Sequence, residues 1–153
     1  IEMPLLVGLT KNVYLKGYID FILYDEDLQK VYIYDIKTST RGWGEREKKD
    51  DNKLAQILLY KEYFGRQFGF DVDRIEVEYF IVKRKIWEES EYTIPRVQSF
   101  KPPSGKTKRK QAVDYLRLIT VFVGKSESDC KRWLDRNKPS LLKLGIPYEV
   151  GSL

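Results

Sequence analysis

The sequence predicts an α/β fold, and three patterns carry that prediction. Residues 13–24 place apolar or small side chains at every second position, the period typical of a half-buried β-strand, and residues 31–38 are rich in the β-branched and aromatic residues that favour strands. Residues 54–68 instead repeat apolar side chains at intervals of three, four and seven, which indicates a helix. Alternation returns at residues 74–83, so the predicted core order is strand, strand, strand, helix, strand, with a shorter strand at residues 5–9 first.

The length of the chain predicts one domain, because 153 residues can bury one core but not two full ones. We expect a core at about residues 5–84 and a basic helical extension at about residues 105–137. The sequence starts at Ile1 without the charged and apolar segments of a signal peptide, so we expect it to begin inside a longer natural chain.

The first two long strands are predicted to form a hairpin. In residues 13–24 the odd positions are apolar or small and form one buried face, which leaves Asp20 on the opposite face. The cluster Asp25, Glu26 and Asp27 then makes a turn before the second strand, residues 31–38.

The connections and helices follow from glycine, proline and charge. Residues 40–51 hold two glycines and eight charged residues and are predicted to form a mobile loop before a helix that ends near Gly69. Residues 95–105 form a second predicted loop, followed by a basic run made of Lys106, Lys108, Arg109 and Lys110. A helix is predicted after this run, packing against the sheet through Ala112, Tyr115, Leu116, Ile119, Phe122 and Val123, and another helix is predicted to start at Ser126.

Composition excludes several classes of site and partner. The single cysteine, Cys130, and the absence of histidine exclude zinc fingers, four-cysteine iron–sulfur clusters and histidine-dependent hydrolases, so any metal must be held by oxygen. No stretch is apolar enough to span a membrane, and the lone cysteine fits a reducing cytoplasm. The net charge of +5 favours anionic partners.

Asp35 and Lys37 are the first candidate site residues. They share one face of their strand with Val31 and Ile33, because side chains two positions apart point the same way. Charged groups on an apolar face cost stability unless they pair with each other or bind a ligand. The pattern therefore indicates either a structural salt bridge or a metal ligand beside a lysine that meets a phosphate.

Asp20 extends this candidate site. If residues 13–24 and 31–38 pair as a hairpin, Asp20 lies across from the region of Asp35, and the two carboxylates repel unless a cation lies between them. A hard cation such as Mg²⁺ would remove that repulsion. Lys53, Gln56 and Tyr60 share one side of the following helix, where amide and hydroxyl groups suit phosphate oxygens, although an ordinary surface helix would look the same.

These residues, taken in order, resemble the PD-(D/E)XK nuclease superfamily, specifically its RecB-type branch. The resemblance rests on a G-x-x-D strand at Gly17–Asp20, a D-x-K-T strand at Asp35–Thr38, and a Q-x-x-x-Y helix at Gln56–Tyr60. It covers about half of the chain, from about residue 5 to residue 83. The resemblance implies a restriction-endonuclease-like core, in which a mixed sheet of four to five strands is flanked by helices.

The resemblance also implies a catalytic role for Asp20, Asp35 and Lys37. Asp20, Asp35 and the carbonyl of Ile36 would hold Mg²⁺ or Mn²⁺, and Lys37 would orient the attacking water or stabilise charge on the phosphate. Gln56 and Tyr60 would contact the DNA backbone near the cut. The branch often has a further acidic residue or histidine upstream, for which Glu2 is the only nearby acidic candidate in this sequence. The iron–sulfur members need four cysteines, so this chain is not one of them.

Other cationic and aromatic residues are candidates for DNA contact. The basic run at residues 106–110 lies where a helix start favours phosphate, although it also fits a solvated helix end. Lys53 lies beside the proposed site, and Trp43 could stack on a base or pack against its own protein.

The leading hypothesis is a metal-dependent deoxyribonuclease, an exonuclease of recombination, repair or replication in the cytoplasm of a bacterium or a phage-infected host. The alternatives are a restriction-like or structure-specific endonuclease, a non-catalytic DNA-binding module with the same fold, and a basic α/β domain that binds a protein. The sequence does not choose an oligomeric state.

Overall fold

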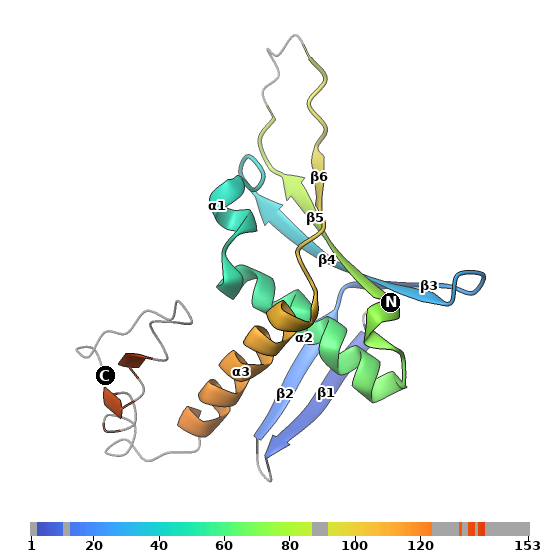
Figure 1. Cartoon of the computed structure of the whole chain (residues 1–153). Helices are drawn as coiled ribbons and strands as arrows, with labels where there is room; N and C mark the ends of the chain where they lie inside the picture. The colour runs from blue at the N-terminus through green and yellow to red at the C-terminus, as the bar shows by residue number, and fades with distance from the viewer. Residues whose placement is uncertain are drawn as a thin grey trace.

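A four-stranded mixed sheet lies at the centre of the protein (Figure 1). The computed structural model describes residues 3–10, 13–86 and 92–123, and five further positions, 132, 135, 136, 138 and 139. In the sheet, β3 pairs antiparallel with β4, β4 pairs parallel with β5, and β5 pairs antiparallel with β6. These strands are β3 (Phe21–Asp25), β4 (Lys30–Ser39), β5 (Ile75–Lys83) and β6 (Val97–Phe100). The predicted α/β class and mixed sheet are confirmed.

A separate two-stranded antiparallel sheet precedes this one. It consists of β1 (Met3–Thr10) and β2 (Val13–Ile19), so the short first strand pairs outside the main sheet and does not add a fifth strand to it. The prediction of one strand over residues 13–24 was wrong, because the chain bends at Asp20 and changes sheets.

The bend at Asp20 also reverses the buried face. Ile19 is fully buried, whereas Phe21 and Leu23 on the same odd positions are 40% and 47% exposed, and Ile22 packs against the core instead. The alternation in sequence runs through the bend without a break, so periodicity alone assigned Phe21 and Leu23 to the wrong side.

The central strands β4 and β5 carry the core. Val31, Ile33 and Asp35 are buried on β4, and β5 buries every second residue along its length, namely Ile75, Val77, Tyr79 and Ile81. The predicted strand over residues 74–83 is therefore confirmed, as is the antiparallel pairing of the segments on either side of the turn at residues 26–29.

The predicted central helix is α2 (Asp51–Phe68). The Asp50 side chain accepts hydrogen bonds from Asn52 N and Lys53 N, which satisfies free amides at the helix start. Gly69 ends the helix in the left-handed region with φ 71°, where glycine is favoured. Phe68 was predicted to lie on the buried stripe but is 43% exposed at the end of α2, where its ring contacts that of Phe64.

Two segments predicted as loops contain regular structure. A short helix, α1 (Glu45–Lys48), lies in the segment predicted as a mobile loop, and the Glu47 carboxylate accepts a hydrogen bond from Gly44 N at its start. β6 lies in the loop predicted over residues 95–105. Its four residues are too few to show a period, and the Gln98 side chain bonds the backbone of Trp43 on both its N–H and its carbonyl. A 3-10 turn, η1 (Val72–Arg74), leads into β5.

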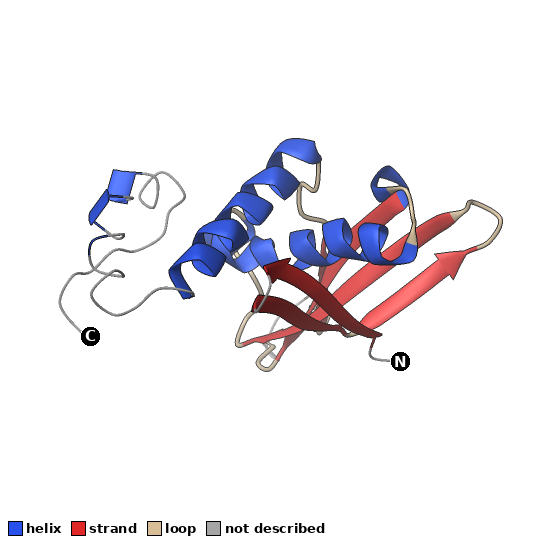
Figure 2. Ribbon diagram, turned by 90° about the horizontal axis from the view of Figure 1, so that it is seen from below, coloured by secondary structure: helices blue, strands red, loops and turns tan. Residues whose placement is uncertain are grey.

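Both long helices lie on one side of the strands (Figure 2). α2 packs on the sheet, whereas α3 (Lys106–Val123) packs mainly on α2 through Ala112, Val113 and Leu116, so the prediction that it packs against the sheet was wrong because α2 already covers that face. The basic run was predicted to precede this helix but forms its first turns, and Ile119, predicted to pack, is exposed. The side chains of Phe122 and Val123 and the predicted helix at Ser126 lie outside the described residues. Within the described residues, no helix is long and apolar enough to cross a membrane.

Candidate active site

The bend at Asp20 brings its carboxylate to β4. Pairing between β3 and β4 stops at Phe21 and Tyr34. Two residues further along β4, Ile36 N donates a hydrogen bond to Asp20 Oδ2 at 2.8 Å. The carboxylate thus replaces the backbone partner that β4 loses where β3 turns away. The sequence argument for a hairpin anticipated this approach of Asp20 to the neighbourhood of Asp35.

Asp35 is a buried carboxyl group on the core face of β4. It is 2% exposed, and its Oδ2 atom lies 2.8 Å from Lys37 Nζ in an ion pair that gives Oδ2 no well-directed hydrogen bond. Burial raises the pKa of Asp35, the adjacent Lys37 ammonium opposes that shift, and the negative charge of Asp20 adds to it. The site therefore holds a carboxylate whose charge its surroundings do not fully compensate.

A chain of hydrogen bonds holds Lys37 in place. Lys37 Nζ donates to Gln56 Oε1 at 2.8 Å, Gln56 Nε2 donates to the Tyr60 hydroxyl at 2.8 Å, and that hydroxyl donates to the carbonyl of Tyr18 at 3.0 Å. One side of α2 supplies Gln56 and Tyr60, because residues four apart on a helix are neighbours. The chain links β4, α2 and β2 through the amine of Lys37.

Gly17 explains how Tyr60 reaches β2. A Cβ atom at Gly17 would lie 2.7 Å from Tyr60 Cε1, which is far inside van der Waals contact. Only a residue without a side chain lets the ring lie flat enough against the strand for its hydroxyl to reach the carbonyl of Tyr18. The glycine of the G-x-x-D motif is thus a packing requirement of Tyr60.

The carbonyl of Ile36 faces the same space as Asp20. In a strand the N–H and C=O of one residue point to the same edge, and the N–H of Ile36 points to Asp20. Two carboxylates and this carbonyl make an all-oxygen set that fits a hard divalent cation, and the Asp35 Oδ2 atom, buried without a hydrogen bond, is what such an ion would satisfy. Within the described residues no three acidic or cysteine side chains gather as a metal cluster, and Glu2 lies outside those residues.

The other residues predicted to contact DNA near the site differ in their exposure and in their partners within the protein. Tyr60 is 6% exposed and its hydroxyl is engaged within the protein, which supports a positioning role. Trp43 packs against Tyr79 and Phe100, so of the two roles considered for it, packing against its own protein is favoured. Lys53 is exposed, with Nζ 5.8 Å from the centre of the Trp43 ring.

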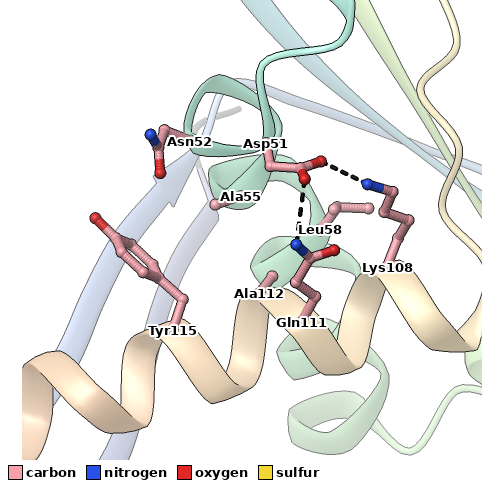
Figure 3. A pocket seen from close by; sticks show the side chains of 8 residues that line it. All are labelled: Asp51, Asn52, Ala55, Leu58, Lys108, Gln111, Ala112 and Tyr115. Atoms are coloured by element: carbon pink, nitrogen blue, oxygen red, sulfur yellow. Dashed lines mark hydrogen bonds and ion pairs between the residues drawn. The ribbon is translucent and has the colours of Figure 1, made fainter. Parts of the chain in front are cut away.

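The basic run is largely engaged in ion pairs. Lys108 pairs with Asp51 at 2.7 Å, and Gln111 bonds the same carboxylate (Figure 3). Arg109 is buried against Glu62 at 3.0 Å, and Lys110 pairs with Asp114 at 2.7 Å, while Lys106 is exposed. Asp51 lies about half a turn around α2 from Gln56, so this run lies on the far side of that helix from the candidate site. Contact of the run with DNA stays a prediction.

A group of cations near the site escaped the sequence analysis. Lys83 is the last residue of β5, Arg84 and Lys85 follow it directly, and Lys83 and Lys85 line a groove with Arg41, Ile86 and Ile94. A run of three cations at the end of a predicted strand was a visible signal. The run at residues 106–110 drew attention instead because it preceded a predicted helix.

Comparison with known proteins agrees with this geometry. The family model of the PD-(D/E)XK nuclease superfamily matches residues 1–135. No curated protein and no solved structure matches the chain significantly. Since the matched segment spans most of the chain and contains both carboxylates, the lysine and the helix that holds it, the chain belongs to the PD-(D/E)XK nuclease superfamily.

Proposed function

We propose that this protein is a metal-dependent deoxyribonuclease that hydrolyses phosphodiester bonds in DNA. Membership of the nuclease superfamily supports the reaction class. The observation that carries the proposal is the meeting of Asp20 with the Asp35–Lys37 segment, where one carboxylate is buried with an oxygen that makes no hydrogen bond.

Asp20, Asp35 and the carbonyl of Ile36 are the residues that would hold Mg²⁺ or Mn²⁺. Hard cations of this kind prefer oxygen ligands and keep several waters of their own, so a set of three protein oxygens is enough. A bound ion of this type would lower the pKa of a water that it binds and neutralise negative charge on a phosphate.

Lys37 supplies the positive charge of the protein at the site. Its side chain is one-third exposed, and its amine is held by Asp35 on one side and Gln56 on the other. A fixed ammonium can orient an attacking water and stabilise the charge that builds on the phosphate oxygens during cleavage. Gln56 and Tyr60 act through Lys37, because their hydrogen bonds fix its position.

The finer proposal is an exonuclease of the RecB-type branch that acts in recombination, repair or replication. The motif spacing at Gly17, Asp20, Asp35, Lys37, Gln56 and Tyr60 supports the branch. An endonuclease with the same site residues can be distinguished from an exonuclease by its substrate, since only an endonuclease cuts circular DNA.

The test is a titration of Mg²⁺ and Mn²⁺ with end-labelled linear DNA and with circular single- and double-stranded DNA. We expect cleavage of linear DNA only, lost in EDTA and lost in Asp20→Asn, Asp35→Asn and Lys37→Met. The variants should remain folded by circular dichroism and should still bind DNA. Full cleavage in EDTA or by Asp35→Asn would remove the proposal, and DNA binding without cleavage under every metal condition would identify a non-catalytic module.

A further inference from the structure

A groove lies where β4 and β5 both end. Arg41, Lys83 and Lys85 line it together with Ile86 and Ile94. Its floor is ordered by the backbone, because Arg84 N donates to the carbonyl of Ser39 at 2.8 Å and Lys85 N donates to the carbonyl of Thr40 at 2.9 Å. The segments that follow β4 and β5 thus continue side by side past the sheet, and the cations lie on these two neighbouring segments.

The cations of this groove differ from several others within the described residues. Lys30, Lys101, Lys108, Arg109 and Lys110 each contact a carboxylate. Within the described residues, Arg41, Lys83 and Lys85 have no such partner. Two more cations flank them and bond only to neutral oxygens, Arg84 to the Thr40 hydroxyl and Arg96 to the carbonyl of Lys83. The three positive charges of Arg41, Lys83 and Lys85 line one groove and repel one another, and an anionic ligand would relieve that repulsion.

The groove continues directly from the candidate active site. Ser39 pairs with Lys83 in the sheet, and Lys37 pairs with Ile81, so Lys83 lies two residues beyond the level of Lys37 on the adjacent strand. Positions two apart point to the same face, so Lys83 and Lys37 lie on the same side of the sheet. Two residues of strand span about 7 Å, which is about two nucleotide steps measured along the axis of a DNA duplex at about 3.4 Å each.

The lining of the groove suits a nucleotide chain better than an isolated anion. The cations can meet phosphates, and the half-buried side chains of Ile86 and Ile94 offer apolar contact to sugars. Phosphate contacts of this kind position a strand without reading its sequence.

We propose that this groove binds the sugar–phosphate backbone of the cleaved DNA strand about two nucleotides from the cut. The inference rests on the proposed nuclease function and adds to it the path of the substrate. It assigns substrate binding to Arg41, Lys83 and Lys85 and not to the ion-paired run on α3.

The test compares salt dependence of DNA binding in an Asp35→Asn background without metal, so that no cleavage occurs. Each phosphate contact contributes about 0.9 to the slope of log K against log salt for duplex DNA and about 0.7 for a single strand. We expect Lys83→Gln with Lys85→Gln to reduce the slope by about 1.8 on duplex and about 1.4 on single-stranded DNA. The charge-matched control is Lys30→Gln with Lys101→Gln, two cations that share Glu76 near the start of β5, at the end of that strand opposite Lys83, and it should leave the slope unchanged.

The outcomes separate this inference from the proposed function. An unchanged slope in Lys83→Gln with Lys85→Gln, or an equal reduction in the control, overturns the groove while DNA binding itself still supports a nuclease. Absence of DNA binding by the parent protein overturns both. Arg41→Gln lies in a loop outside the strands and repeats the test with an expected reduction of about 0.9 on duplex DNA, should the double variant fail to fold.

Discussion

Gly17→Ala tests the packing that holds Lys37. The added methyl would lie 2.7 Å from Tyr60 Cε1, about 1 Å inside the usual carbon–carbon contact, so either β2 or the ring must move. Overpacking of this kind costs about 1–3 kcal/mol, and removal of a strand glycine returns about 0.5–1 kcal/mol. The expected net loss is about 1–2 kcal/mol, which lowers Tm by about 2–8 °C in a domain of this size.

The activity of Gly17→Ala should fall further than its stability explains. Displacement of Tyr60 releases Gln56, and Gln56 then no longer fixes Lys37, so we expect kcat to fall by about 100-fold, the effect of a misplacement near 1 Å. Gly65→Ala is a matched control, because its methyl would lie 2.7 Å from Val72 Cγ2, away from the site. It should lose stability but retain kcat below its Tm.

Two measurements would refute this reasoning. Thermal unfolding of Gly17→Ala at the wild-type Tm would show that the ring and strand are not in close contact. Equal losses of kcat in the two glycine variants, measured well below both Tm values, would show that general loosening and not the Lys37 chain limits the reaction.

Three further predictions follow from the same site. Asp35→Asn should be inactive yet more stable than wild type by about 0.5–2 kcal/mol at neutral pH. Because the pKa of Asp35 is raised above its ordinary 3.8, the stability of the wild type falls as the pH rises from that value through the folded-state pKa. In urea unfolding, the difference in stability between the two proteins should therefore widen over this pH range and then stay constant, and a difference that narrows contradicts the raised pKa. Gln56→Leu removes the hydrogen bond that holds Lys37, so it should lower kcat by about 10- to 100-fold while the free energy of unfolding changes by about 1 kcal/mol. If kcat and DNA affinity fall in parallel, Gln56 instead binds DNA directly. Mg²⁺ at about 100 times its Kd should stabilise wild type by about 2.7 kcal/mol but leave Asp35→Asn unchanged, and calorimetry that finds equal shifts places the ion elsewhere.

Much of the site could be predicted because it depends on strand periodicity. Asp35 and Lys37 follow Val31 and Ile33 at intervals of two, and that spacing alone assigned both charges to the buried face of β4. The spacing of Gln56 and Tyr60 likewise assigned them to one side of α2. Both inferences need only the local geometry of one element.

The features that escaped prediction depend on contacts between elements. The alternation of residues 13–24 does not reveal that Asp20 changes sheets, since that depends on which neighbours β2 and β3 find. Trp43 packs against Tyr79 of β5 and Phe100 of β6. The sequence around Trp43 does not indicate that these two strands lie beside it. The sequence also does not show that Lys108 and Arg109 are engaged by carboxylates of α2.

The change of sheets at Asp20 makes the protein unequally tolerant of insertions and deletions. A length change in the connection between β1 and β2 alters the small sheet but leaves Phe21 paired with Tyr34 and the Asp20 carboxylate beside Ile36 N. Loss of one residue between Asp20 and Asp25 would instead shift the register of β3, turn each of its side chains to the opposite face and withdraw the carboxylate from β4. Homologous sequences should therefore vary in length before Val13 and keep a constant spacing from Asp20 to Lys37.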